Sequence, residues 1–347
     1  MELSNQHKAA ELLRRRRARA SLMEFSQAIE IPGIPLIEAP DAEDPRTGKL
    51  IDPIERAPAA YTSIETRIAP HHRLIMEAIQ RCIETPRGRL MIFSPPGSAK
   101  STYASVVAPA WIMGKKPNTQ IILASYGTGI AAKQSRKVRT IVKDPKYSSI
   151  WPERPVLNDD QRAVDDWQLS NGSSMMAAGL LAGITGNRAD GVIIDDPVAN
   201  RESADSATLR EKTYNEYIDT AMTRAKPKMW TIIIQTRWHE EDLSGAILPL
   251  DYAGESGLID CRDGQRWEVL CLQARAERED DPLGRKVGDY LWPEWFPPEH
   301  WATWEKNPRA ARTWGALYQQ RPAPDAGIHF NPAMFHWYNQ SLPACDS

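Results

Sequence analysis

Four short apolar segments, each followed by polar or small residues, constrain the fold more than any other feature of the sequence. They cover residues 90–93, 121–124, 192–194 and 231–234, and helix-forming stretches separate them. Segments that are apolar throughout are typical of strands that helices cover on both faces. We therefore predict an α/β fold with a mostly parallel sheet flanked by helices. Ligands of such sheets bind at the carboxyl ends of the strands.

A β-hairpin is predicted between the second and third of these segments. Asn171 and Gly172 lie between two strand-like stretches in WQLSNGSSMMAAG. The pair Asn-Gly favours a two-residue hairpin turn, because both residues tolerate positive φ. We expect this hairpin to be an insertion in the sheet.

Length and composition indicate more than one structural unit. The chain has 347 residues, and seven of its 12 tryptophans follow residue 260. A chain of this size exceeds what one core usually accommodates. We predict a helical arm and linker at residues 1–60, a core at 61–255 and a Trp- and Pro-rich subdomain and linker at 256–347. The two terminal segments are expected to form a smaller lid subdomain on the core. The basic run at 14–17 fits either a solvated helix face or a contact with DNA or a partner.

Charge and cysteine content exclude several classes of site. The formal net charge is -2, so any contact with nucleic acid must come from a local basic patch. The four cysteines have no metal-ligand spacing and no CxxC pair, which argues against a zinc site or a disulfide framework. The sequence contains no run of about 18 apolar residues. We expect a cytosolic protein.

The segment after residue 93 has features of a phosphate-binding loop. The usual pattern, G-x-x-x-x-G-K-[ST], joins a strand to a helix, with the lysine on the β- and γ-phosphates and the hydroxyl on Mg²⁺. Here Ser94 and Ala99 occupy the two glycine positions. The prediction depends on the order of strand, loop, Lys-Ser and helix, and an ordinary strand-to-helix turn is the alternative. The predicted nucleotide-binding residues are Ser94, Pro95, Pro96, Gly97, Ser98, Ala99, Lys100, Ser101 and Thr102.

Two adjacent carboxylates follow the apolar segment at 192–194. Mg²⁺ prefers oxygen ligands, so Asp195 is predicted to hold the ion opposite Ser101. Asp196 occupies the position where related ATPases commonly place a glutamate that polarises the attacking water. Its side chain is one methylene shorter than that of glutamate, so Glu202 is the second candidate for the catalytic acid. The alternative is a pair of solvent-exposed acids that open a turn.

Two further segments carry candidate residues. Polar residues, including Thr236 and Arg237, follow the apolar segment at 231–234, where they could sense the γ-phosphate. The sequence HEE in this segment lacks the second histidine of a zinc helix, so we expect no metal there. In the predicted helix at 129–144, Arg136 and Arg139 share the face opposite the apolar one. This face is either solvated or supplies an arginine finger to the ATP of a neighbouring subunit.

Several motifs, taken in order, resemble the large terminase subunit of tailed bacteriophages. They are HHRLIMEAI, SPPGSAKS, LASYGTGIAAKQSRKVR, GITGNRADGVIIDDP, TRWHEEDLSG, DYLWPEWFPPEHW and ALYQQRPAPDAGIHF, within residues 65–330. The segments TRWHEEDLSG and IIDDP are the most specific. Family members often read PPRHGKS, and here Gly97 stands in place of the arginine, which shifts the expected finger to Arg136, Arg139 or Arg188.

The resemblance implies a P-loop ATPase of the additional-strand, RecA-like class that uses ATP and Mg²⁺ to translocate double-stranded DNA. Lys100 and Ser101 match the Walker A residues, Asp195 the Walker B acid, Asp196 the catalytic acid, and Thr236 with Arg237 the coupling segment. Implied partners are double-stranded DNA, the portal protein, the small terminase subunit and other copies in a ring. The expected location is the host cytoplasm, with transient docking on the viral procapsid.

Family members also carry a C-terminal nuclease domain, and we expect an ATPase-domain fragment without nuclease activity. Two other functions remain open at this point. A helicase-like translocase shares the P-loop and the acidic strand end, but residues 255–347 lack the alternating strands and helices of a second nucleotide-facing lobe. A non-catalytic DNA-binding or scaffold protein fits the substituted glycines, whereas Lys100, Ser101 and Asp195 oppose it.

Overall fold

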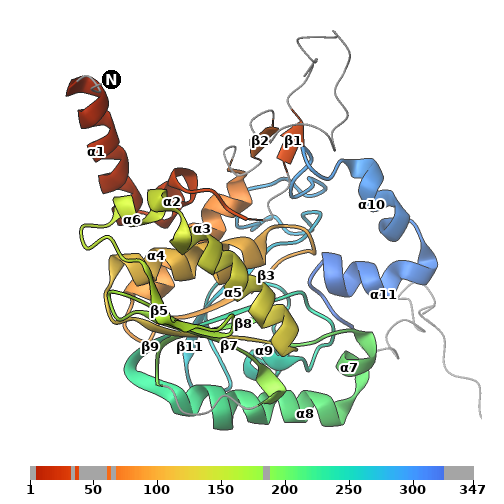
Figure 1. Cartoon of the computed structure of the whole chain (residues 1–347). Helices are drawn as coiled ribbons and strands as arrows, with labels where there is room; N and C mark the ends of the chain where they lie inside the picture. Colours follow the sequence, from red (N-terminus) through yellow and green to blue (C-terminus); the bar gives the residue numbers. More distant parts are fainter. Residues whose placement is uncertain (1–4, 33–35, 39–60, 64–67, 183–187, 324–347) are drawn as a thin grey trace, which may run out of the picture.

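A nine-stranded sheet forms the centre of the protein (Figure 1). The computed structural model describes residues 5–32, 36–38, 61–63, 68–182 and 188–323. The strand order is β10-β11-β3-β9-β8-β4-β7-β6-β5, and β1 pairs with β2 in a separate sheet. The strands are β1 (Leu36–Glu38), β2 (Tyr61–Ser63), β3 (Arg89–Phe93), β4 (Gln120–Ser125), β5 (Leu157–Arg162), β6 (Asp166–Leu169), β7 (Ser174–Gly179), β8 (Ala189–Asp195), β9 (Ala225–Gln235), β10 (Gly257–Asp260) and β11 (Arg266–Cys271).

The six strands from β11 to β7 in this order are parallel, and the remaining strands at the two ends of the sheet pair antiparallel. The four predicted apolar segments are β3, β4, β8 and β9, which lie side by side in the middle. The prediction of a mostly parallel, helix-flanked sheet is therefore confirmed. Strand β9 lies between β3 and β8, so an additional strand separates the loop-bearing strand from the acid-bearing one.

Helices cover both faces of the sheet, and Figure 1 shows α3, α4 and α5 on one side and α8 on the other. The side chains of β9 alternate accordingly: Ile232 and Ile234 pack with the first group, and Ile233 packs with the second. The helices are α1 (Asn5–Ala20), α2 (Leu22–Ala28), α3 (Pro70–Glu84), η3 (Thr102–Val107), α4 (Ala108–Lys115), α5 (Thr128–Lys143), α6 (Pro145–Ile150), η4 (Leu180–Ala182), α7 (Arg201–Asp205), α8 (Ala207–Glu216), η5 (Tyr217–Ala221), η6 (Met222–Arg224), α9 (Leu243–Ile247), α10 (Pro298–Glu305), η7 (Pro308–Ala310), α11 (Ala311–Thr313) and η8 (Trp314–Tyr318).

The predicted hairpin is present as β6 and β7, and β7 joins the sheet beside β4. Its predicted turn length was wrong. Leu169 N–H donates to the Ser173 carbonyl, and Gly172 N–H donates to the Leu169 carbonyl, which leaves three residues in the turn. Gly172 has a φ of 81°, the left-handed conformation that ends such a three-residue turn. The Asn-Gly pair thus marks the hairpin correctly, but the glycine closes a longer loop.

Segments outside the predicted core at 61–255 pack against it or extend it. The N-terminal residues Ala18, Leu22 and Phe25 are fully buried in the larger hydrophobic core. Strands β10 and β11 follow residue 255, yet β11 pairs with β3 in the main sheet. The three-part division of the chain stays a prediction, but the sheet itself extends to Cys271.

No described helix is both long enough and apolar enough to cross a membrane. Among residues 5–32, 36–38, 61–63, 68–182 and 188–323, no three His, Cys, Asp or Glu side chains are grouped as a metal cluster would require.

Candidate nucleotide and metal site

The carboxyl ends of three adjacent strands bring the predicted site residues together. Phe93 of β3 pairs in register with Gln235 of β9, and Asp195 of β8 pairs with Ile234. The loop after β3, the acids at the end of β8 and the polar segment after β9 therefore meet at one edge of the sheet. This is the edge at which parallel sheets bind their ligands.

The loop between β3 and η3 contains two residues with left-handed backbone conformations, separated by one position. Gly97 has a φ of 80° and Ala99 a φ of 63°. The usual loop has glycine at position 99 because that conformation costs other residues energy. Ala99 adopts it nonetheless, so the left-handed conformation that glycine usually supplies is present here. Hydrogen bonds inside the loop stabilise it: Ser94 Oγ donates to Ser98 Oγ, and Ser98 Oγ donates to the Pro95 carbonyl, both at 2.7 Å.

The helix that follows the loop, as the order of strand, loop, Lys-Ser and helix predicts, contains π-helical turns near its start. Residues Thr102–Val107 form η3, and α4 continues it to Lys115. π-Helical turns inside longer helices occur frequently at functional sites.

Lys100 is buried in the site, with 6% of its surface exposed. Its Nζ donates a hydrogen bond to Thr236 Oγ1 at 2.9 Å and lies 3.7 Å from Asp196 Oδ2. Asp196 Oδ1 in turn accepts a hydrogen bond from the Thr236 N–H at 2.9 Å. Asp196 has a φ of 45°, a left-handed conformation held by these contacts. Lysine, threonine and carboxylate thus form one connected group where the terminal phosphates of a nucleotide would lie.

Asp195 fits the role of a magnesium-binding carboxylate. Its Oδ1 accepts a hydrogen bond from Ser101 Oγ at 2.8 Å, while its buried Oδ2 has no hydrogen-bond partner in the described part of the chain. Burial and the neighbouring Asp196 carboxylate raise the pKa of Asp195 to about 6, although the hydroxyls of Ser105 and Ser101 and the Lys100 ammonium lower it. A buried carboxylate oxygen without a partner, beside a hydroxyl, is a donor set that suits a hard cation.

Helix α5 carries a half-buried lysine, Lys137, that the sequence did not single out. Burial and the neighbouring Lys133 lower the pKa of Lys137, and the negative charge of Asp195 opposes that change. Lys137 therefore lies within electrostatic reach of Asp195. The predicted face of α5, with Arg136 and Arg139, is a different one: Arg136 is exposed, and Arg139 Nη1 donates to the Ala163 carbonyl at 3.3 Å.

An aromatic side chain from the C-terminal part of the chain packs on the loop. A Cβ atom added to Gly97 would lie 2.7 Å from Phe296 Cζ, so only glycine leaves room for this ring. The Phe296 ring also contacts Trp292 and Trp301. The sequence does not predict this contact, because no local pattern links the segment DYLWPEWFPPEHW to the loop. Gly97 thus fills the arginine position of the family pattern for a steric reason.

Two histidines that precede β3 lie beneath the loop. His71 and His72 are fully buried, and both rings pack against Trp292. Burial lowers the pKa of His72 to about 3, and burial together with the charge of His72 lowers the pKa of His71 well below its usual value. Both rings form part of the support of the loop, together with Trp292 and Tyr103.

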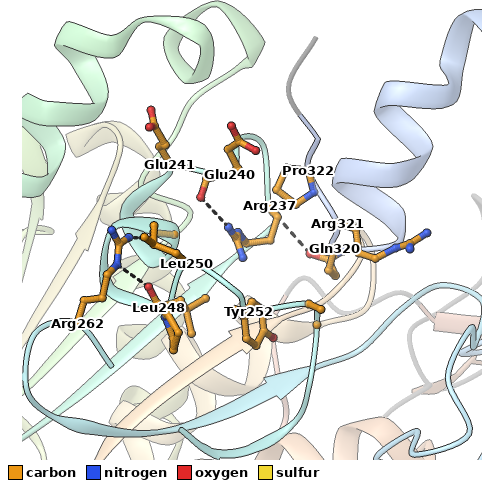
Figure 2. Close-up of a pocket in the computed structure, with 14 residues that line it drawn as sticks. Arg237, Glu240, Glu241, Leu248, Leu250, Tyr252, Arg262, Gln320, Arg321 and Pro322 are labelled. Carbon is orange, nitrogen blue, oxygen red and sulfur yellow. Dashed lines mark hydrogen bonds between the residues drawn. The ribbon is translucent and has the colours of Figure 1, made fainter. Parts of the chain in front are cut away.

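Arg237, the second residue of the predicted coupling segment, is held by contacts on several sides (Figure 2). Its Nε donates to Asp242 Oδ2 at 2.8 Å, its guanidinium carbon lies 5.0 Å from the centre of the Phe93 ring, and its N–H donates to Gln320 Oε1 at 3.3 Å. It borders a cavity of about 480 Å³ that Tyr252 and Arg262 also line. The residue after Thr236 is therefore connected directly to the C-terminal segment of the described chain.

Some predicted residues lie apart from this group. Glu202 is exposed in the short helix α7, and within the described residues no hydrogen bond or ion pair joins its side chain to Lys100 or Asp196. Arg188 is exposed, and its Nη1 donates to the Ala225 carbonyl at 3.5 Å. The roles of Glu202, Arg136, Arg139 and Arg188 stay predictions.

The order of β3, β9 and β8, with the lysine loop after the first strand and the acids after the last, is that of an additional-strand P-loop NTPase, and the protein has this fold. A family model described as terminase large subunit, T4likevirus-type, N-terminal, matches residues 91–316. The chain belongs to this family of large terminase subunits, which confirms the resemblance found in the sequence.

Two solved structures are similar to the chain. The large terminase of bacteriophage HK97 shares 14% identity with a TM-score of 0.46, over 74% of this chain and 51% of that one. The large terminase ATPase domain of Thermus phage P74-26 shares 17% identity with a TM-score of 0.43, over 68% of this chain and 90% of that one. The chain thus spans about half the length of the HK97 protein. No curated protein sequence matches it significantly.

Proposed function

We propose that this chain is an ATPase that powers the translocation of double-stranded viral DNA into a preformed capsid. The observation that carries the proposal is the buried Lys100 beside Asp196 and Thr236, with the Ser101–Asp195 hydrogen bond next to it. Membership of the large terminase family supplies the link to DNA packaging.

Each residue of the site has a separate role in ATP hydrolysis. The loop backbone and Lys100 bind the phosphates, and Ser101 and Asp195 hold Mg²⁺, which neutralises developing charge on the phosphates when it is bound. Asp196 lies beside Lys100, where it can accept a hydrogen bond from the attacking water. Glu202 is the alternative acid, and its exposed position requires a movement of α7. Thr236 and Arg237 transmit the state of the nucleotide toward Gln320.

The proposal includes assembly. Copies of the chain form a ring with the portal protein and the small terminase subunit, docked on the procapsid in the host cytoplasm. Arg136 is exposed on α5 and is the better placed of the two finger candidates, because Arg139 is partly buried and bonded to Ala163. A planar guanidinium from a neighbour would stabilise charge in the transition state.

The test compares nucleotide binding and hydrolysis in the wild type, Lys100→Ala and Lys146→Ala. Lys146 is exposed and pairs with Glu30 far from the loop, so its variant is the matched control. We expect Lys100→Ala to lose Mg²⁺-ATP binding and at least about 100-fold of the hydrolysis rate, since a single charge-stabilising group is worth about 10²–10³ in rate. Binding is measured separately because one subunit alone lacks a neighbour's arginine. Failure of the wild type to bind Mg²⁺-ATP, or equal binding by wild type and Lys100→Ala, would contradict the proposal and favour a non-catalytic scaffold.

A further inference from the structure

Two buried serine hydroxyls on the Asp195 side of the sheet have no hydrogen-bond partner among the residues that the structure describes. Ser105 is 0% exposed and Ser125 is 1% exposed, and in the described part of the chain neither Oγ has a partner. Asp195 Oδ2 shares this property. Buried polar atoms are nearly always paired, and leaving one unpaired costs about 1–3 kcal/mol. A group of such atoms around one carboxylate therefore points to a ligand that satisfies them.

The backbone places both serines on the side of the sheet that Asp195 faces. Ser125 ends β4 and pairs in parallel register with Asp195 of β8, so the two side chains leave the same face of the sheet. Ser105 follows Ser101 by one turn in the π-helix η3. Its hydroxyl is close enough to Asp195 to lower the pKa of that carboxyl.

The chemistry of the three groups matches hydrated magnesium. Mg²⁺ gives up its water reluctantly and usually keeps several molecules when it binds protein carboxylates. Such waters need acceptors and donors around them, and the partners of metal-bound ligands strongly affect metal affinity. A serine hydroxyl can donate and accept, so it can orient a water whose other contact is the ion.

We propose that Ser105 and Ser125 form an outer binding layer for Mg²⁺, in which their hydroxyls orient the water molecules of an ion held by Ser101 and Asp195. This inference rests on the proposed function, because it assumes that Mg²⁺-nucleotide binds at this site. It adds two positioning residues that neither the loop pattern nor the acid pair contains.

The test uses the variants Ser105→Ala, Ser125→Ala and the double variant, with Ser135→Ala as the matched control. Ser135 is also a fully buried serine, but its Oγ donates to the Val164 carbonyl at 2.6 Å and accepts from Trp167 Nε1 at 2.8 Å. Each variant is measured in two ways: urea unfolding of the metal-free protein, and the stabilisation that Mg²⁺-ADP gives beyond ADP with EDTA. The first readout does not depend on catalysis.

We expect the double variant to be as stable as the wild type, or more stable, without metal, because it removes unpaired hydroxyls. Its apparent affinity for Mg²⁺ in the presence of ADP should fall about 10-fold or more, the usual effect of removing partners of metal ligands. Ser135→Ala should show the reverse: lower stability and unchanged Mg²⁺ affinity.

Unchanged Mg²⁺ affinity in the double variant would overturn the inference while leaving the proposed function intact, provided that the wild type binds Mg²⁺-ADP. Lower stability of the metal-free double variant, with Mg²⁺ affinity unchanged, would assign the serines a purely structural role. A wild type that shows no Mg²⁺-dependent nucleotide binding would overturn both this inference and the proposed function.

Discussion

The ammonium of Lys100 donates a hydrogen bond to the hydroxyl of Thr236 at 2.9 Å, and the N–H of Thr236 donates to Asp196 Oδ1 at the same distance. One residue of the predicted coupling segment thus contacts both the candidate phosphate-binding lysine and the candidate catalytic acid. The next residue, Arg237, contacts Gln320 through its backbone. Under the proposed function, these hydrogen bonds would carry a change at Lys100 to Gln320 across two residues.

The first prediction concerns the Thr236 hydroxyl. Thr236→Val keeps the shape of the side chain but removes the acceptor for Lys100, and a hydrogen bond to a charged group is worth about 1.5–3 kcal/mol. We expect the hydrolysis rate to fall about 10-fold or more, with nucleotide affinity changed less, because the Lys100 charge remains. Thr213→Val is the control, since the Thr213 hydroxyl donates within α8 to the Leu209 carbonyl. Equal rates in the two variants would rule out a role for the Thr236 contact.

The raised pKa of Asp195 predicts a pH dependence of stability. The pKa rises from 3.8 to about 6 on folding, so the folded protein binds more protons than the unfolded chain between these values. The stability contribution of Asp195 is therefore full below pH 3.8 and is lost as the pH rises toward 6, on the order of 3 kcal/mol at 1.36 kcal/mol per pKa unit. Urea unfolding of Asp195→Asn and wild type between pH 4 and 7 measures this contribution of Asp195 to the free energy of unfolding. Parallel curves for the two proteins would exclude it.

The buried histidines predict the opposite slope. The pKa of His72 falls from 6.5 to about 3 on folding, so the unfolded chain binds the extra proton between these values and acid favours unfolding. At pH 5 this costs about 2 kcal/mol relative to neutral pH. His72→Phe should reduce the loss of stability between pH 7 and pH 5 by that amount, measured by urea unfolding. An equal loss of stability in His72→Phe and the wild type would exclude this contribution.

Much of the fold could be predicted from the sequence because its signals are local. Apolar runs identify the strands β3, β4, β8 and β9, and the Asn-Gly pair identifies the hairpin. The spatial order of the strands carries no local signal. Parallel strands pair through long crossover connections, so β9 could be placed between β3 and β8 only from the family resemblance.

The central residues of the site could be predicted from the sequence, whereas the residues around them could not. Lys100, Ser101, Asp195, Asp196 and Thr236 meet as the sequence motifs predict. The glycine pattern alone does not identify the loop, because Ala99 adopts the left-handed conformation at a position where glycine is usual. Phe296, Ser105 and Ser125 were missed because their relation to the site depends on tertiary packing and not on spacing along the chain.

The contact between Gly97 and Phe296 predicts a coupled pair of variants. Gly97→Ala meets both a φ of 80° and the Phe296 ring, so it should destabilise the protein by about 1–3 kcal/mol and weaken nucleotide binding. Adding Phe296→Ala removes the clash but not the backbone strain, so the double variant should recover part of the loss. Gly129→Ala in α5 is the control, because an added Cβ there meets nothing within 4 Å. Strictly additive effects of the two changes would show that the ring does not restrict position 97.

The last prediction concerns the buried ion pair between Arg237 and Asp242, whose side chains are 4% and 1% exposed. Removing one member of a buried pair leaves a charge without a partner and costs about 3–5 kcal/mol, so Asp242→Ala should lower the free energy of unfolding by that amount. Arg237→Lys should not substitute fully, because the planar guanidinium also lies over the Phe93 ring and a lysine lacks that geometry. The control is Asp260→Ala, which breaks a pair with Arg266 that is 63% and 84% exposed, and an exposed pair contributes about 0–1 kcal/mol. If urea unfolding gives similar losses for Asp242→Ala and Asp260→Ala, the Arg237 pair does not stabilise the coupling segment.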